Sequence, residues 1–254
     1  MSNSVISSKA DIGNNFSIKN FSVIEDDVVI GNNVEIGSNV LIANGARISD
    51  NVKIHHGAVI STIPQDLKFE GEVTTMEIGD GTVIREYATL NRGTNYSNKT
   101  VVGSNCFIMA YAHVAHDCII GDRVIIANSV QMGGHVEIGD WTIIGGLVPI
   151  HQFTKIGAHV MIGGGFRTVK DVPPYILVGN LPLRFEGVNI VGLRRRGFTN
   201  EQIYNIKDAY DVIYKSGFNV SDAVKEITAK GNVPDEVKLI LDFIEKSDRG
   251  IIRG

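Results

Sequence analysis

Cysteine is nearly absent from this chain of 254 residues, since Cys106 and Cys118 are the only two. Two cysteines are too few for a multi-cysteine zinc motif or for the disulfide framework of a small secreted protein. No apolar run approaches the roughly 18 residues that a membrane-spanning helix needs. The N-terminal MSNSVISSKADIG has no hydrophobic signal core. We therefore expect a cytoplasmic protein with no integral membrane segment.

An excess of positive charge is also missing. The chain has 24 Lys and Arg against 28 Asp and Glu, for a net charge of −4. Nucleic-acid-binding surfaces are normally basic, so the composition does not favour a nucleic-acid partner. The 43% hydrophobic content is enough for a globular core.

Helical periodicity is missing from the first two thirds of the chain, where hydrophobic residues recur every six. From Ile6 to Ile162, 24 multiples of six carry an aliphatic residue or Met, and 20 of them are Ile. The residue two places earlier is usually small or β-branched, so the two side chains point the same way, as in a short strand. Short strands joined by tight corners at a fixed period predict a parallel β-solenoid with three hexapeptides per triangular coil.

The period of six is interrupted twice, at 61–75 and at 91–99, and it stops after Gly165. Because the phase survives both interruptions, they are predicted to be loops that leave the solenoid and return. We predict a solenoid over residues 1–190 and a small α-helical C-terminal domain over residues 191–254.

The helical part is predicted from its end signals. Thr199 and Gln202 have the spacing of a capping box, and apolar residues then recur at three and four from Ile203 to Ile213. Pro234 precedes a second amphipathic stretch that ends near Ile244.

Four of the seven histidines are predicted to gather at one edge of the solenoid. In a coil of 18 residues, positions 114, 132 and 150 stack with a step of about 4.8 Å. The four histidines lie within three residues of these positions, outside the inward slots: His113, His116, His135 and His151. The first loop leaves from the same column and carries Gln65, Asp66 and Lys68. Such convergence predicts a site; the alternative is a solvated loop beside scattered surface histidines.

The remaining slots predict packing and assembly. Both cysteines stand two places before an inward isoleucine, so they are expected to be buried small hydrophobes. The residue just before each inward aliphatic residue points outward, yet on two faces of the prism these outward residues are apolar. Apolar stripes on an outer surface are normally covered, which predicts a homo-oligomer. One stripe is Phe107, Ile125, Ile143 and Met161, and the other is Val83, Val101 and Ile119. On the third face the outward residues are apolar in the early coils and mostly polar in the later ones. The early residues are Val5, Val23, Leu41 and Val59, and the later ones are Glu77, His113, Gln131 and Pro149.

An ordered set of motifs resembles one family closely: PQDLKFEGE, IREYATLNRGT, AHVAHDC, MGGHVEIG, VPIHQF, IGAHVMIGGG, DVPPY and GLRRRGF. They are similar to motifs of the UDP-N-acetylglucosamine O-acyltransferases that begin lipid A synthesis, and the match covers nearly the whole chain. The resemblance implies an all-β, left-handed parallel β-helix, a homotrimer, and transfer of a (R)-3-hydroxyacyl chain to the sugar's 3-hydroxyl. The donor is acyl carrier protein, which carries phosphopantetheine; no cofactor or metal is bound by the enzyme itself.

The resemblance also assigns roles to individual residues. His116 corresponds to the general base, Asp117 to the carboxylate that orients it, and Gly134 to the oxyanion-hole backbone. An imidazole suits the first role because its ordinary pKa is about 6.5. The substrate contacts correspond to Gln65, Asp66, Lys68, His113, His135, His151, Gln152, Asn189, Arg195 and Arg196. Gly164 corresponds to the position that sets acyl length, where a glycine favours a longer chain.

Three departures and three alternatives stay open. Asn91, Tyr111 and Val191 differ from the family pattern, which leaves details of the nucleotide and acceptor open. The first alternative is an N-acyltransferase that uses a 3-amino nucleotide sugar with acyl carrier protein or acyl-coenzyme A. The second is a zinc hydro-lyase with His113, His116 and His135 as ligands, and the third is a non-enzymatic scaffold.

Overall fold

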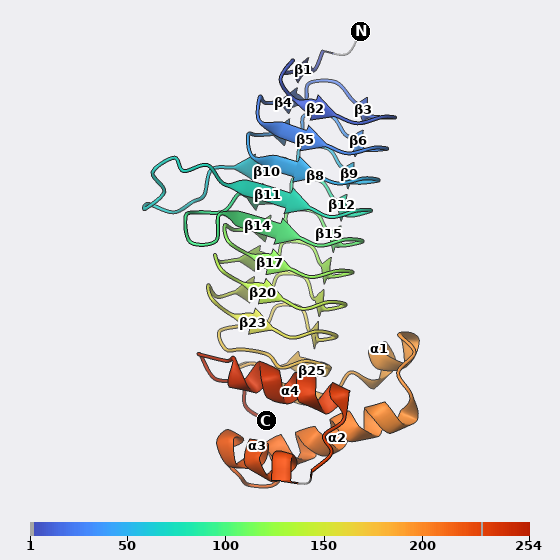
Figure 1. Cartoon of the computed structure of the whole chain (residues 1–254), viewed down its shortest axis with the longest axis vertical. Coiled ribbons are helices and arrows are strands. Elements are labelled where there is room, and N and C mark those ends of the chain that lie inside the picture. Colours follow the sequence, from blue (N-terminus) through green and yellow to red (C-terminus); the bar gives the residue numbers. More distant parts are fainter. Residues whose placement is uncertain (1–2, 230) are drawn as a thin grey trace.

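The chain winds into a triangular prism of short parallel strands, closed at its C-terminal end by four helices (Figure 1). It is described here from a computed structural model that covers residues 3–229 and 231–254. Each coil contributes one strand to each of three sheets, which we name A, B and C. This arrangement confirms the predicted parallel solenoid.

The strands of each sheet follow one another along the prism axis. Sheet A contains β1 (Val5–Ile6), β4 (Val23–Ile24), β7 (Leu41–Ile42), β10 (Val59–Thr62), β13 (Thr89–Asn91), β16 (His113–Val114), β19 (Gln131–Met132) and β22 (Pro149–Ile150). Sheet B contains β2 (Asp11–Ile12), β5 (Val28–Ile30), β8 (Ala46–Ile48), β11 (Thr75–Ile78), β14 (Lys99–Val102), β17 (Ile119–Ile120), β20 (Glu137–Ile138) and β23 (Lys155–Ile156). Sheet C contains β3 (Ser17–Ile18), β6 (Glu35–Ile36), β9 (Lys53–Ile54), β12 (Val83–Ile84), β15 (Phe107–Ile108), β18 (Ile125–Ile126), β21 (Ile143–Ile144), β24 (Met161–Ile162), β25 (Ile176–Gly179) and the antiparallel β26 (Arg184–Val188).

The two inward slots of each hexapeptide build the core, as predicted. Outside the two loops, every sixth residue from Ile24 to Ile162 is 3% exposed or less, whereas Ile6 at the open N-terminal end is 42% exposed. Burying one such side chain contributes about 2 kcal/mol relative to leaving it in water. Both cysteines are buried in this core. Burial raises the pKa of Cys106 to about 11 and that of Cys118 to about 12, so both stay protonated thiols at neutral pH.

The two predicted loops leave the prism between neighbouring strands of different sheets. The first spans 63–74, between β10 and β11, and the second spans 92–98, between β13 and β14. Both extend from the same side of the prism (Figure 1).

The two loops change which residues stack on one another in successive coils. This corrects two of the outward-facing sets of stacked residues that the sequence predicted. Val59 pairs with Thr89 thirty residues later, and Thr89 pairs with His113 twenty-four residues later. Each loop therefore adds whole hexapeptides, which preserves the inward phase but moves the following strand to another sheet. Val83 consequently stacks on Phe107 in sheet C instead of joining Val101 and Ile119. Glu77 lies in sheet B, and Thr89 takes its predicted place beside His113.

Four helices follow the solenoid: α1 (Ile190–Arg195), α2 (Asn200–Lys215), α3 (Val220–Ala229) and α4 (Asp235–Glu245). The Thr199 capping box is present and Pro234 is the N-cap of α4, as predicted, whereas α3 was not predicted. The Tyr210 hydroxyl is fully buried and donates to the Pro174 carbonyl, which joins α2 to the last coil. None of the helices within 3–229 and 231–254 is long and apolar enough to cross a membrane.

Candidate active site

The predicted histidine edge is the corner at which the chain passes from sheet A to sheet B, which we call the A–B corner. His116 and Asp117 form this corner after β16, Gly134 and His135 form it after β19, and Gln152 with Phe153 form it after β22. Strand pairing stacks these three corners in successive coils. The geometry thus brings together side chains that lie 18 residues apart in the sequence.

The central contact of this corner joins His116 to Asp117. His116 Nδ1 lies 2.7 Å from Asp117 Oδ2, and the Asp117 side chain is fully buried while that of His116 is 12% exposed. Because the carboxylate accepts a hydrogen bond, it holds the proton on Nδ1 and leaves Nε2 as the basic nitrogen. The pair has the geometry of a general base with its orienting carboxylate.

The 92–98 loop surrounds the Asp117 carboxylate with donors. The Thr94 N–H and hydroxyl donate at 3.0 and 2.7 Å, and the Ser97 hydroxyl and N–H also donate to it. Burial on its own would raise the pKa of Asp117, but the hydrogen bonds from Ser97, His116 and Thr94 outweigh it and lower the pKa to about 2. Asp117 is therefore ionised throughout the range in which His116 acts as a base.

Thr94 and Ser97 were not predicted as site residues. The sequence signal was the interruption of the period at 91–99, which marked the loop but not its target. Only the fold shows that this loop covers Asp117, which lies in the next coil.

The low pKa of Asp117 predicts a specific acid sensitivity. Its stabilising contribution is present above the ordinary value of 3.8 and is lost as pH falls through about 2. A difference of this size corresponds to about 2 kcal/mol. We expect the stability gap between wild type and Asp117→Asn, measured by urea unfolding, to shrink by about that amount between about pH 5 and about pH 2. An equal gap at both pH values would show that folding does not lower the pKa of Asp117.

Gly134 lies directly against the His116 ring. A Cβ placed on Gly134 would approach His116 Cε1 to 2.5 Å and Nε2 to 2.8 Å, which is closer than real contacts allow. Glycine at this position therefore provides the space that the imidazole occupies.

The Gly134 N–H has no acceptor among residues 3–229 and 231–254. At the next corner of the prism, the N–H groups of Ser104 and Asp122 are capped at 2.7 and 2.8 Å by aspartates one coil on. The uncapped Gly134 N–H beside the base is available to a developing oxyanion.

His135 faces the same pair from the next coil. Its ring stacks on Phe153 with centroids 4.2 Å apart and meets the His116 ring edge-on at 5.0 Å. Its Nδ1 is 3.9 Å from Asp117 Oδ2 and has no hydrogen-bond partner among the described residues. Burial lowers the pKa of His135, and nearby Asp117 opposes that shift. His135 therefore presents a neutral ring to the site.

The other predicted residues of this corner lie around it. His113 Nδ1 contacts the Thr89 hydroxyl at 2.7 Å, and burial lowers the pKa of His113. In the first loop Asp66 is half-buried and close enough to His135 to influence its charge, while Gln65 and Lys68 are exposed. His151 and Gln152 lie two coils beyond His116.

Asn91, one of the departures from the family pattern, has a structural contact. It is buried, and its amide donates to the Thr62 hydroxyl at 2.9 Å and to the Ile63 carbonyl at 3.1 Å. Asn91 thereby anchors the start of the first loop to β13.

The predicted nucleotide contacts lie elsewhere on the monomer. Arg196 stacks over Trp141 at 5.4 Å and contacts His159, both of which belong to the corner between sheets B and C. With Arg195 it lines a cavity of about 500 Å³ over the Phe107 stripe of sheet C. Asn189 is the N-cap of α1 and donates to the His159 carbonyl. These three residues therefore do not meet the His116 corner within one chain.

Gly164 also lies at another corner. It follows β24, where the chain returns from sheet C towards sheet A, and it is exposed. A Cβ there would meet only the Gly146 backbone, at 3.1 Å from its carbonyl oxygen. The backbone at Gly164 is therefore open to solvent.

The structure does not bring together the three histidines that the zinc hydro-lyase alternative requires as ligands. The only group of potential metal ligands within 3–229 and 231–254 consists of His116, Asp117 and His135, with ligand atoms within 4.8 Å of one another. His113 is not part of it, so the ligand set required by the hydro-lyase alternative is not formed.

Comparison with known proteins agrees with this architecture. A bacterial transferase hexapeptide family model matches residues 9–44, 27–62 and 99–134, and a model described as domain 2 of UDP N-acetylglucosamine O-acyltransferase matches residues 171–252. An acyl-[acyl-carrier-protein]–UDP-N-acetylglucosamine O-acyltransferase from Sulfurihydrogenibium is 48% identical over 97% of this chain and 92% of its own length. One from Chlorobaculum parvum is 56% identical over 77% of this chain and 75% of its own.

The solved structures agree as well. UDP-N-acetylglucosamine acyltransferase from Bacteroides fragilis is 48% identical, covers 99% of this chain and 98% of its own, and superposes with a TM-score of 0.95. This similarity extends the parallel solenoid to the expected left-handed parallel β-helix with a helical C-terminal region. The chain belongs to the family of acyl-[acyl-carrier-protein]–UDP-N-acetylglucosamine O-acyltransferases.

Proposed function

We propose that this protein transfers a (R)-3-hydroxyacyl chain from the phosphopantetheine thioester of acyl carrier protein to the 3-hydroxyl of UDP-N-acetylglucosamine, the first step of lipid A biosynthesis. The observation that carries the proposal is the His116–Asp117 pair with the free Gly134 N–H beside it. Family membership supports the choice of donor and acceptor.

In the proposed mechanism His116 Nε2 removes the proton from the sugar hydroxyl while its oxygen attacks the thioester carbonyl carbon. The imidazolium that forms is stabilised by ionised Asp117 at Nδ1. The carbonyl oxygen becomes negatively charged and accepts from the Gly134 N–H. Collapse of this tetrahedral intermediate breaks the carbon–sulfur bond, and His116 returns its proton to the leaving thiolate.

The positions of the remaining residues support the substrate-binding roles that the resemblance implies. Asp66 and the exposed Gln65 and Lys68 line the loop side of the corner, where they contact the sugar nucleotide. His113 and His135 flank the base, and His151 with Gln152 continues the same corner toward the donor. The enzyme needs no bound cofactor, because the reactive thioester arrives on the carrier.

We propose that the site is completed in a homotrimer. Asn189, Arg195 and Arg196 are assigned to the uridine diphosphate, and guanidinium groups suit phosphate oxygens. Since they lie at the corner between sheets B and C, they reach the acceptor only if a partner subunit packs that corner against the A–B corner. The apolar stripe of Phe107, Ile125 and Ile143 beside them supports such packing.

We also infer a longer acyl chain and a cytoplasmic enzyme. Exposed Gly164 carries no side chain to close the acyl groove, and soluble nucleotide sugar and carrier are both cytoplasmic substrates.

The test is a direct assay with product mass spectrometry. Purified protein is incubated with UDP-N-acetylglucosamine and a mixed pool of (R)-3-hydroxyacyl carrier proteins. We expect an ester-linked product with a long acyl chain, formed by a species of three chains in sedimentation. The competing N-acyltransferase predicts turnover only with a 3-amino nucleotide sugar, and an amide product from that sugar alone would overturn the proposal.

A further inference from the structure

One carboxylate oxygen at the A–B corner lies between two imidazole nitrogens. His116 Nδ1 is 2.7 Å and His135 Nδ1 is 3.9 Å from the same atom, Asp117 Oδ2. The first contact is a hydrogen bond, whereas His135 Nδ1 is buried and has no hydrogen-bond partner among the described residues. Leaving a buried polar atom unpaired costs about 1–3 kcal/mol. The proposed acyl transfer does not use this nitrogen.

The three atoms are spaced for a small tetrahedral cation. Bonds of about 2.0–2.1 Å to zinc separate two ligand atoms of a tetrahedron by roughly 3.3 Å. The distances of 2.7 and 3.9 Å lie about 0.6 Å on either side of that value, and the three residues present ligand atoms within 4.8 Å of one another. Because the His135 ring is parallel to the Phe153 ring, it can slide towards Asp117 and keep this stack. Three protein ligands leave the fourth position of zinc to water.

The surroundings of these atoms favour a cation. Within 3–229 and 231–254 the only ion-pair partners of Asp117 are the two histidines, so no Lys or Arg neutralises its charge. The Thr94 hydroxyl donates to Asp117 Oδ2 and the Ser97 hydroxyl to Oδ1, which orients the carboxylate as outer partners of metal ligands do. Half-buried Asp66 adds a second negative charge, close enough to influence His135.

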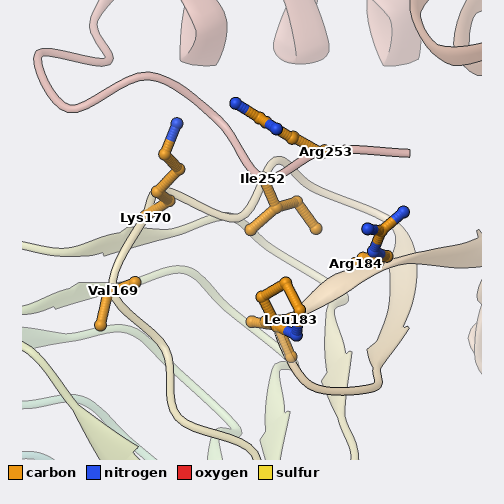
Figure 2. A pocket seen from close by; sticks show the side chains of 7 residues that line it. Val169, Lys170, Leu183, Arg184, Ile252 and Arg253 are labelled. Atoms are coloured by element: carbon orange, nitrogen blue, oxygen red, sulfur yellow. The ribbon is translucent and has the colours of Figure 1, made fainter.

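A cavity of about 230 Å³ at the C-terminal end of the solenoid has the opposite chemistry. Its lining includes the basic side chains of Lys170, Arg184 and Arg253 beside aliphatic Leu183 and Ile252 (Figure 2). Protonated Lys and Arg have no lone pair for a metal and repel cations. Zinc is therefore directed to the A–B corner, which holds the only group of three potential ligands in the described part of the chain.

We propose that His116 Nδ1, Asp117 Oδ2 and His135 Nδ1 bind one zinc ion, and that the bound ion inhibits acyl transfer. A neutral imidazole has one N–H and one lone pair, so zinc at Nδ1 of His116 requires the proton at Nε2. The proton moves from Nδ1 to Nε2 through water, and none is gained or lost. His116 then has no lone pair to take the proton of the sugar hydroxyl. The zinc site does not depend on the proposed function, whereas the inhibition rests on it.

Zinc binding is measured by equilibrium dialysis of protein first stripped with a chelator. We expect wild type to hold one zinc ion per chain. His135→Ala should bind zinc about 100-fold or more weakly, since even outer partners of a metal site contribute about 10- to 100-fold. The matched control is His113→Ala, which should bind zinc like wild type, because His113 contacts the Thr89 hydroxyl and lies outside the ligand group. X-ray absorption of zinc-loaded wild type needs no variant and should show two imidazoles and one carboxylate.

Inhibition is measured as turnover of wild type with and without zinc. Saturating zinc should lower kcat by about 100-fold, the scale of losing a general base, and a chelator should restore it. Nitrogen NMR of His116 should show the proton on Nδ1 in the metal-free protein and on Nε2 with zinc.

The opposite results are equally clear. Wild type that holds no stoichiometric zinc, His135→Ala that holds it as tightly, or other ligands in the absorption spectrum would overturn the site. Unchanged or faster turnover at saturating zinc would overturn the inhibition. Metal-free wild type that transfers no acyl chain would instead contradict the proposed function, and dialysis would still decide the zinc site.

Discussion

Replacing His116 with alanine is expected to lower kcat by roughly 100-fold or more, the usual scale for losing a general base. The imidazole is the group whose Nδ1 is held by buried Asp117 and whose ring lies on Gly134. No other described side chain in this corner has that arrangement. Steady-state rates with acyl carrier protein and UDP-N-acetylglucosamine measure the effect.

The control for this variant is His55→Ala. His55 lies in an earlier coil, where it contacts Glu86 and is 41% exposed, so its loss should leave kcat unchanged. Because the His116 side chain lies at the surface of the prism and outside its hydrophobic core, the melting temperature of His116→Ala should stay within a few degrees of wild type. Unchanged turnover in His116→Ala would refute its role as the base.

Gly134→Ala is expected to lower kcat by about 100-fold, although it adds one methyl group and keeps the backbone N–H. The added Cβ would lie 2.5 Å from His116 Cε1 and 2.8 Å from Nε2, so the imidazole must move. Moving it disturbs the 2.7 Å contact with Asp117 and displaces Nε2 from the attacking hydroxyl. A misplacement of about 1 Å costs about 100-fold in rate.

The matched control is Gly179→Ala in β25, where a Cβ would meet its neighbours only at an ordinary distance of 3.6 Å. Both variants should fold like wild type. If Gly134→Ala kept wild-type kcat while Gly179→Ala did too, the close packing of Gly134 on the base would have no catalytic importance.

The period of six determined the inward face of the whole solenoid from sequence alone. Each hexapeptide buries the same two slots whatever its neighbours, so the burial of Ile120 and of both cysteines followed from local phase. The adjacency of His116 and Asp117 along the chain likewise marked them as a candidate pair. The outward or inward direction of such residues depends only on strand alternation.

Tertiary structure decided which outward residues stack on one another in successive coils. Loops that add whole hexapeptides leave the phase unchanged, so the sequence placed Val83 and Glu77 in the wrong columns. Hydrogen bonding between coils selects the sheet, and loop length in residues does not reveal it.

The sequence by itself therefore determined the solenoid and its core, because these depend on a repeated local pattern, and the resemblance to the family proposed His116 as the base. Only the folded chain decided that Thr94 and Ser97 keep Asp117 ionised and that Gly134 lies on the His116 ring. It also placed Arg196 away from that ring, at a different corner. The physical reason is that hydrogen bonds and close contacts between coils join residues whose separation in sequence carries no periodic signal.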